Sequence, residues 1–265
     1  MASIKRKSQR VREGDMTIFD HLAELRMRIV RSMLAIGIGA AAILIFYDFV
    51  LDIMTQPYRN TCVANPDFNC DGSLYALGPV EGLASRMRIS GYGGLVLALP
   101  VVLWQLWRFI VPALHPKEKK YSVPFILSAV TLFILGGVTA YWTLDKALEF
   151  LIAWSGEDVN QTYQISKYIS LVAMMVLAFG IGFLSPVLIV FLQLVGVVSP
   201  QTLLRQWRVA IMIIFGLSAV ITPSGDPISM LALALPMSLL YLVAVLIGMV
   251  AQKRALRRER QSMTP

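Results

Sequence analysis

The stretch YISLVAMMVLAFGIGFLSPVLIVFLQLVGVV, residues 168–198, contains no charged side chain. A helix needs about 20 consecutive apolar residues to cross the ~30 Å hydrocarbon core of a bilayer. The stretch therefore predicts a membrane-spanning helix. Because the run is longer than one crossing requires, it also predicts that the helix is strongly tilted or emerges from the membrane.

The composition of the whole chain agrees with this interpretation. Hydrophobic residues make up 57% of the 265 residues and charged residues 15%, which leaves too few polar side chains to cover a soluble globule. The sequence thus indicates an integral membrane protein surrounded by the lipid bilayer. No short apolar core with a small-residue cleavage site follows the basic N-terminus, so we expect the first span to be retained.

Five further apolar runs flank the opening stretch, which predicts an all-α protein with six transmembrane helices. Prolines inside three of the spans (Pro100, Pro186 and Pro236) predict kinks and a concave bundle, because each proline removes a backbone hydrogen bond. The last two helices are expected to be short, above all the fifth, whose uninterrupted run reaches only ~20 Å. The six predicted spans are 31–49, 89–110, 121–144, 168–198, 209–221 and 228–250.

The basic residues favour one orientation of this bundle. All but five of the 24 Lys and Arg side chains fall in segments on the side of the N-terminus, and an excess of Lys and Arg is typical of cytoplasmic segments. Both termini are therefore expected in the cytoplasm. The same distribution argues against a nucleic-acid partner. We expect a basic tail over residues 1–16, a membrane domain over 17–250 and a second basic tail over 251–265.

Two cysteines, Cys62 and Cys70, bracket VANPDFN in the first external loop. On an oxidising face this spacing predicts a small loop closed by a disulfide, and a pair of unlinked thiols is the alternative. No metal site is expected, because neither histidine of the chain is assigned to that side.

Motifs of enzymes are missing from the sequence. There is no GxSxG, HExxH, P-loop or GxGxxG pattern, so we expect no catalytic residues, no enzyme activity and no cofactor. A small-solute secondary transporter is the alternative function, and a structural scaffold is another. A transporter would usually carry ionisable residues deep in its spans, which are nearly free of them here.

Two acids stand at the predicted cytoplasmic membrane edge: Glu24 in HLAELRMR and Glu118 in HPKEKK. In one interpretation, Glu24 forms an i,i+4 pair with Arg28 worth ~0.2–0.5 kcal/mol, and Glu118 is a solvated loop acid. In the other, the two carboxylates form a receptor for a basic peptide whose arginines bind them in bidentate geometry. The residues alone leave both interpretations open.

Four motifs together resemble the TatC family, the multi-spanning subunit of the twin-arginine protein translocase. They are HLAELRMR, PVVLWQLWRFIVPALHPKEKK, AFGIGF followed by Pro186, and ITPSGDPISMLALALPM. The resemblance covers roughly residues 17–250. It implies a receptor in the bacterial cytoplasmic membrane for twin-arginine signal peptides of folded precursors. It also implies partners of the TatA and TatB type, a homo-oligomer within the receptor complex, and transport driven by the proton-motive force without ATP.

The resemblance also assigns residues to roles. It implies that signal peptides bind at Glu24, Glu118, Arg26, Arg28 and Phe109. For translocation or partner contact it implies Pro57 in the first external loop and Thr222 and Asp226 in the last external turn. Two further positions, Leu184 and Met230, depart from the family, since many members carry a polar residue there. We therefore expect a more apolar partner contact at these positions.

Overall fold

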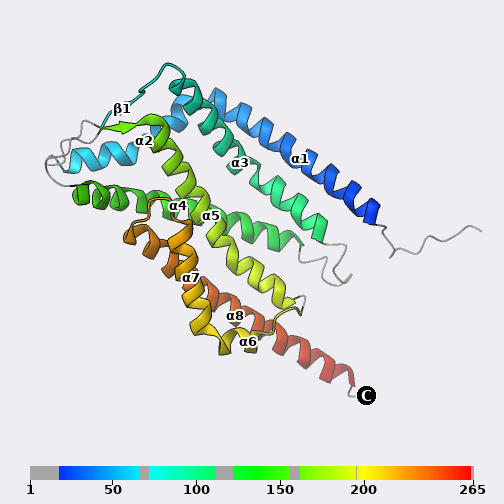
Figure 1. The fold of residues 1–265 in the computed structure, drawn as a ribbon. Helices are drawn as coiled ribbons and strands as arrows, with labels where there is room; N and C mark the ends of the chain where they lie inside the picture. The colour runs from blue at the N-terminus through cyan, green and yellow to red at the C-terminus, as the bar shows by residue number, and fades with distance from the viewer. Residues whose placement is uncertain (1–17, 66–71, 111–121, 156–161, 195, 264–265) are drawn as a thin grey trace, which may run out of the picture.

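The computed structural model describes residues 18–65, 72–110, 122–155, 162–194 and 196–263 (Figure 1). Within these ranges the chain is almost entirely helical. The elements in chain order are α1 (Ile18–Ile45), α2 (Tyr47–Ala64), β1 (Leu74–Tyr75), α3 (Glu81–Ile110), α4 (Ser122–Ser155), β2 (Tyr163–Gln164), α5 (Ile165–Leu194), α6 (Pro200–Arg205), α7 (Trp207–Ile221) and α8 (Pro227–Met263).

The six predicted spans overlap α1, α3, α4, α5, α7 and α8, and the first of them also reaches into α2. All of these except α7 are long and apolar enough to cross a membrane, whereas α7 has 15 residues and a length of about 22 Å. The prediction of a short fifth helix is confirmed. The prediction of a short sixth helix is wrong, because α8 has 37 residues.

α8 is long because its helix does not stop where its apolar stretch stops. The apolar part runs over Pro227–Lys253, and the helix continues through the basic segment to Met263. Part of the predicted tail over residues 251–265 is therefore helical. Its Arg, Lys, Gln and Leu side chains are good helix formers, and they extend a helix that has already been nucleated.

The structure contains a helix, α2, in the segment that the sequence interpretation treated as the end of the first span and an external loop. This helix has a charged face, with Asp52 and Arg59 exposed, and a buried face. The buried side chains recur at helical spacing: Tyr47, Thr55, Pro57, Tyr58, Thr61 and Cys62. α2 is thus an amphipathic helix. In Figure 1 it lies at the end of the bundle where β1 lies.

The opening stretch ends its helix earlier than predicted. α5 stops at Leu194 rather than Val198, because Gly196 has a positive φ of 78°, a conformation that glycine adopts at no steric cost. The short α6 is then capped by Ser199, whose side-chain oxygen accepts a hydrogen bond from the N–H of Thr202 at 3.2 Å. Proline at the next position suits the first turn of a helix.

Close helix pairs hold the bundle together. α1 packs along α3, and a Cβ added at Gly94 of α3 would lie 2.5 Å from the backbone nitrogen of Ala40. α4 packs against α5 in the same way, since a Cβ at Gly136 would lie 2.6 Å from the carbonyl oxygen of Phe179. Small residues let the backbones of membrane helices approach closely. Pro100, Pro186 and Pro236 lie inside continuous helices, and their kinks remain a prediction.

At the end of the bundle near α2, a small parallel pair of strands joins β1 to β2, with Leu74 opposite Tyr163 and Tyr75 opposite Gln164. These two-residue strands are a minor departure from an all-α fold. Tyr58 of α2 is fully buried beside them, with its ring edge-on to that of Tyr163 at 5.1 Å between centroids. Burial raises the pKa of the Tyr163 phenol, which keeps this side chain neutral and suited to an apolar setting.

Candidate functional site

An open pocket of about 260 Å³ lies between the start of α1 and the end of α3, lined by Glu24, Met27, Arg28, Arg31 and Arg108. Arg28 bridges the two helices. Its Nη2 binds Glu24 in an ion pair one turn apart on α1, and its Nη1 donates a hydrogen bond to the carbonyl oxygen of Gln105 at 3.3 Å. The predicted i,i+4 pair is thus present, and it faces α3 rather than bulk solvent.

The polar groups of this pair are only partly satisfied. Within the described residues, Glu24 Oε2, Arg28 Nε and Gln105 Oε1 are buried and have no hydrogen-bond partner. A carboxylate can accept about four hydrogen bonds and an arginine can donate five. The pocket therefore has unused acceptor capacity on Glu24 and unused donor capacity on Arg28, which is the arrangement expected of a site for a charged ligand.

The other residues expected to bind signal peptides lie apart from this pair or outside the described residues. Arg26 is exposed and does not line the pocket, because two residues along a helix turn a side chain about 200° away. Phe109 is half-buried near the end of α3, next to the pocket residue Arg108. Glu118 lies outside the described residues. Sequence reasoning missed Arg31 and Arg108, although Arg31 follows Arg28 at i,i+3 and Arg108 lies within the second motif.

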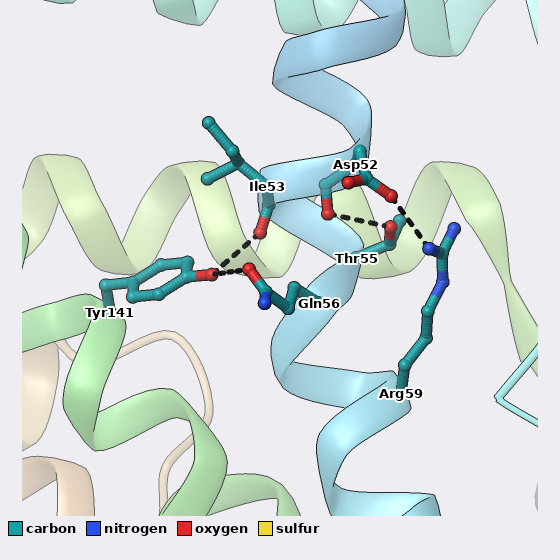
Figure 2. A network of polar contacts seen from close by, with 6 residues as sticks. All are labelled: Asp52, Ile53, Thr55, Gln56, Arg59 and Tyr141. Atoms are coloured by element: carbon teal, nitrogen blue, oxygen red, sulfur yellow. Dashed lines mark hydrogen bonds and ion pairs between the residues drawn. The ribbon is translucent and has the colours of Figure 1, made fainter.

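Pro57 is buried within α2, at the other end of the bundle. A proline lacks the N–H that would bind the carbonyl four residues earlier, which is the carbonyl of Ile53. Figure 2 shows that the hydroxyl of Tyr141, from α4, points at this carbonyl and donates to it at 3.0 Å. The same view shows the ion pair between Arg59 and Asp52 at 2.7 Å on the solvent side of α2. Pro57 thus creates an acceptor through which α4 holds α2.

Cys62 of α2 is disulfide-bonded. Its predicted partner, Cys70, lies outside the described residues, so the pairing of the two remains a prediction. Among the residues that the structure describes, no group of three or more His, Cys, Asp or Glu side chains could hold a metal ion.

The turn between α7 and α8 contains the residues expected to contact a partner. Thr222 is buried at the end of α7 and its Oγ1 donates to the carbonyl oxygen of Ser218 at 2.9 Å. Asp226 is 2% exposed, and its Oδ1 accepts from the N–H of Ser229 at 2.7 Å. Met230 is half-buried one turn into α8. The turn therefore brings Thr222, Asp226 and Met230 into one short segment.

Leu184 lies elsewhere in the fold. It lines an apolar cavity of about 150 Å³ between α3, α4 and α5, together with Trp107, Phe125 and Phe191. Trp107 is buried, and its ring lies 4.1 Å from that of Phe125 between centroids. A leucine suits these surroundings, because a carboxylate or amide would have to be buried here among apolar side chains.

The fold and the pocket define a class of protein: a multi-spanning helical membrane protein with a pocket at one end of the bundle that is lined by charged side chains. The sequence profile of the TatC family, described as Sec-independent protein translocase protein (TatC), matches residues 20–236. The chain belongs to the TatC family.

Individual relatives agree with this assignment. The chain is 38% identical over 260 residues to the Sec-independent protein translocase protein TatC of Frankia casuarinae, covering 96% of this chain and 71% of that protein. It is 35% identical over 242 residues to TatC of Aquifex aeolicus, covering 90% of this chain and 97% of that one. A crystal structure of the twin-arginine translocase receptor TatC superimposes with a TM-score of 0.71 at 34% identity, covering 88% of this chain and 99% of that one.

Proposed function

We propose that this chain is the receptor subunit for twin-arginine signal peptides and uses the pocket between α1 and α3 as part of its binding site. The observation that carries the proposal is the state of Glu24. One of its oxygens binds Arg28, the other is buried without a partner among the described residues, and Glu24 lines the pocket. An arginine of a signal peptide can bind this second oxygen while Arg28 keeps the first.

The second acid and the aromatic residue complete the proposed site. Glu118 follows the end of α3, which carries the pocket residue Arg108 and the half-buried Phe109. Two carboxylates offer one partner to each of two consecutive arginines, and bidentate arginine–carboxylate pairs are geometrically specific. Lysine cannot reproduce this fork, so the proposed site discriminates against a twin-lysine peptide.

The position of the site supports a particular arrangement in the membrane. We infer that α7 crosses the bilayer with the five longer helices, that both termini are cytoplasmic, and that the pocket faces the cytoplasm of a bacterial cell. The excess of basic residues in the segments on the N-terminal side supports this orientation. In it, α2 and the α7–α8 turn with Asp226 face the external side.

We further propose that the chain acts with partners, as a homo-oligomer with single-span subunits of the TatA and TatB type, to export folded proteins at the expense of the proton-motive force. The names of the relatives and of the similar crystal structure support a place in this translocase. The turn with Thr222, Asp226 and Met230 is the proposed partner contact, with Pro57 positioning the external cap.

Binding of a synthetic twin-arginine signal peptide to the purified chain in phosphatidylcholine nanodiscs tests the receptor proposal. Losing one charge-assisted contact costs ~1.5–3 kcal/mol. We therefore expect Glu24→Gln and Glu118→Gln each to raise the Kd about tenfold or more. A twin-lysine peptide should bind more weakly than the twin-arginine peptide.

The matched control is Glu149→Gln, which removes an exposed acid of α4 that pairs with Lys146, away from the pocket. This variant should bind the peptide like the unmodified chain. Equal binding of the lysine peptide, together with no effect of Glu24→Gln or Glu118→Gln, would refute the proposed site.

A further inference from the structure

The pocket between α1 and α3 is more basic than a site for a cationic peptide alone requires. Among the described residues, three guanidinium groups, those of Arg28, Arg31 and Arg108, line it together with one carboxylate, that of Glu24. The described part of the lining therefore carries a formal excess of two positive charges. Glu24 is already engaged with Arg28, so the excess lies on the other two arginines.

These two arginines are available to a ligand. Arg31 and Arg108 are both exposed, and the ion pairs of the described residues do not include either of them. Arg28 contributes as well, since its Nε is buried without a partner within the described ranges. Converging guanidinium groups with free donors match the oxygens of a phosphate in charge and in bidentate geometry.

An apolar surface adjoins the basic pocket. A shallow groove of about 490 Å³ runs along α1 and is lined by Ile29, Val30, Met33, Leu34, Gly37, Ile38 and Ala41. Met27 of the pocket connects the two, because Met27, Val30 and Leu34 recur at i, i+3 and i+7 on one face of the helix. A Cβ at Gly37 would meet no atom within 4 Å, which leaves space in the groove.

The size and position of the groove fit a lipid chain. It extends over about 18 Å of α1, at ~1.5 Å per residue, which is more than half of the ~30 Å hydrocarbon core. Only 6% of the apolar window of α1 is buried in the bundle, against 44% for α5, which leaves most of this helix open to contact with lipid. A charged headgroup pocket beside an apolar groove at the membrane edge is complementary to a phospholipid.

We propose that Arg31 and Arg108, with Arg28, bind the phosphate of an anionic phospholipid whose acyl chain lies in the groove of α1. Lipid binding in itself does not depend on the receptor function. One consequence does rest on that function: a phosphate that draws Arg28 away from Glu24 offers both oxygens of the carboxylate, rather than one, to the arginine of a signal peptide. The anionic lipid then strengthens peptide binding without being required for it.

Titration of the purified full chain in a non-ionic detergent tests the proposal, with bound lipid counted by native mass spectrometry. The ligands are phosphatidylglycerol, phosphatidylcholine and inorganic phosphate. We expect phosphatidylglycerol to bind in preference to phosphatidylcholine. The double variant Arg31→Gln/Arg108→Gln should raise its Kd about thirtyfold, from the loss of two basic groups near an anionic ligand.

A charge-matched control separates the pocket from diffuse attraction. Arg205→Gln/Arg208→Gln removes two exposed basic residues of α6 and α7 and should leave the Kd within about threefold, because neither residue lines the pocket. A second variant, Arg31→Lys/Arg108→Lys, keeps the charge but not the fork, and its Kd should fall between those of the unmodified chain and the glutamine pair. Thermal unfolding midpoints check that all variants fold.

Three results would overturn the proposal. If phosphatidylcholine bound as strongly as phosphatidylglycerol, the apolar groove alone would account for lipid binding. If Arg205→Gln/Arg208→Gln weakened phosphatidylglycerol binding as much as Arg31→Gln/Arg108→Gln does, the net charge of the chain would account for it. Binding of inorganic phosphate as strong as that of phosphatidylglycerol would make it a free-anion site. The receptor proposal is tested separately, by peptide binding in phosphatidylcholine nanodiscs. The peptide can therefore bind there even if the chain does not prefer phosphatidylglycerol, and the chain can prefer phosphatidylglycerol even if the peptide does not bind.

Discussion

Asp226 combines two properties that rarely coincide, a carboxylate and near-complete burial. It occupies the position before Pro227, the first residue of α8, and its Oδ1 accepts from the N–H of Ser229 at 2.7 Å. This is the geometry of a helix N-cap, and a negative charge there is favoured by the helix dipole. Its Oδ2 is buried without a partner among the described residues. Of the two oxygens, only Oδ1 therefore makes a hydrogen bond within the described residues.

Two substitutions of Asp226 separate the cap from the charge. Asp226→Ala removes the capping acceptor and should lower the free energy of unfolding by about 1 kcal/mol. Asp226→Asn keeps a capping oxygen and should stay within about 0.5 kcal/mol of the unmodified chain, because asparagine caps as well as aspartate. Thermal unfolding of the purified variants in detergent measures both. If asparagine is as damaging as alanine, the charge and not the cap holds this turn.

At the scale of single residues, sequence predicts local pairs and misses distant ones. The pair of Glu24 and Arg28 follows from i,i+4 spacing. By contrast, Arg88 of α3 donates to the carbonyl oxygen of Ser166 at 3.0 Å, and the guanidinium of Arg86 lies 4.6 Å from the centre of the Tyr47 ring. These contacts join segments far apart in the chain, so the spacing of residues along one helix contains no sign of them.

The helix α2 shows how a proline can dock an element rather than break it. Without an N–H at Pro57, the carbonyl of Ile53 has no donor from its own helix, and Tyr141 of α4 supplies one (Figure 2). A second hydroxyl, that of Tyr168 in α5, donates to the carbonyl of Met54 at 2.9 Å. Two consecutive carbonyls of α2 are thus bound by two neighbouring helices.

A double-mutant cycle tests this role of Pro57. Tyr141→Phe should cost about 1 kcal/mol of unfolding free energy, because the carbonyl of Ile53 loses its donor. In a Pro57→Ala background residue 57 regains an N–H, and the same change should cost less. We expect a coupling of about 0.5–1 kcal/mol in thermal unfolding.

The matched control for this cycle is Tyr168→Phe. The carbonyl it contacts belongs to Met54, whose helical donor four residues later, the N–H of Tyr58, is present with or without Pro57. Its cost should therefore be the same in both backgrounds. Equal costs for Tyr141→Phe in the two backgrounds would show that Pro57 does not create the acceptor.

At the scale of elements, the sequence predicts the apolar membrane helices and misses the amphipathic helix α2. The spans are visible because lipid demands long uninterrupted apolar runs. α2 is not, because its buried face includes Thr55 and Thr61, and an internal proline argues against a helix when only propensity is considered. The helical spacing of its aromatic and small side chains was the available signal. Likewise, helix formation beyond Lys253 in α8 has no apolar signature.

The proposed sites lie toward opposite ends of the molecule. The pocket is lined by residues from the start of α1 and the end of α3, and in Figure 1 these helix ends lie away from α2 and the α7–α8 turn. α5 forms the buried centre and packs against α3, α4 and α8. The sequence placed Phe109, Leu184 and Met230 within helices, as the structure does, but placed Pro57 in an external loop rather than in α2. The pairing of Glu24 with α3 through Arg28 required the structure, since it depends on which helices are neighbours.

The length of α7 is a property of the whole molecule in its membrane. Its 15 residues span about 22 Å, so a bilayer of ~30 Å must thin locally beside it if α7 crosses. We expect this thinning to assist transport. Lengthening α7 by one turn of leucine and alanine adds about 6 Å and removes most of the mismatch. Export of a twin-arginine precursor should then fall, with peptide binding by the purified chain unchanged because the pocket lies on α1 and α3.

An insertion of the same length in α8 beyond Lys253 is the control, since this part of the helix lies outside the apolar stretch. It lengthens the chain equally without changing the thickness that α7 matches, so export should persist. Unchanged export by the chain with the longer α7 would contradict the hypothesis that the short helix assists transport by thinning the bilayer. A loss of peptide binding in that variant would instead point to a rearranged bundle, because thinning beside α7 leaves the contact between α1 and α3 in place.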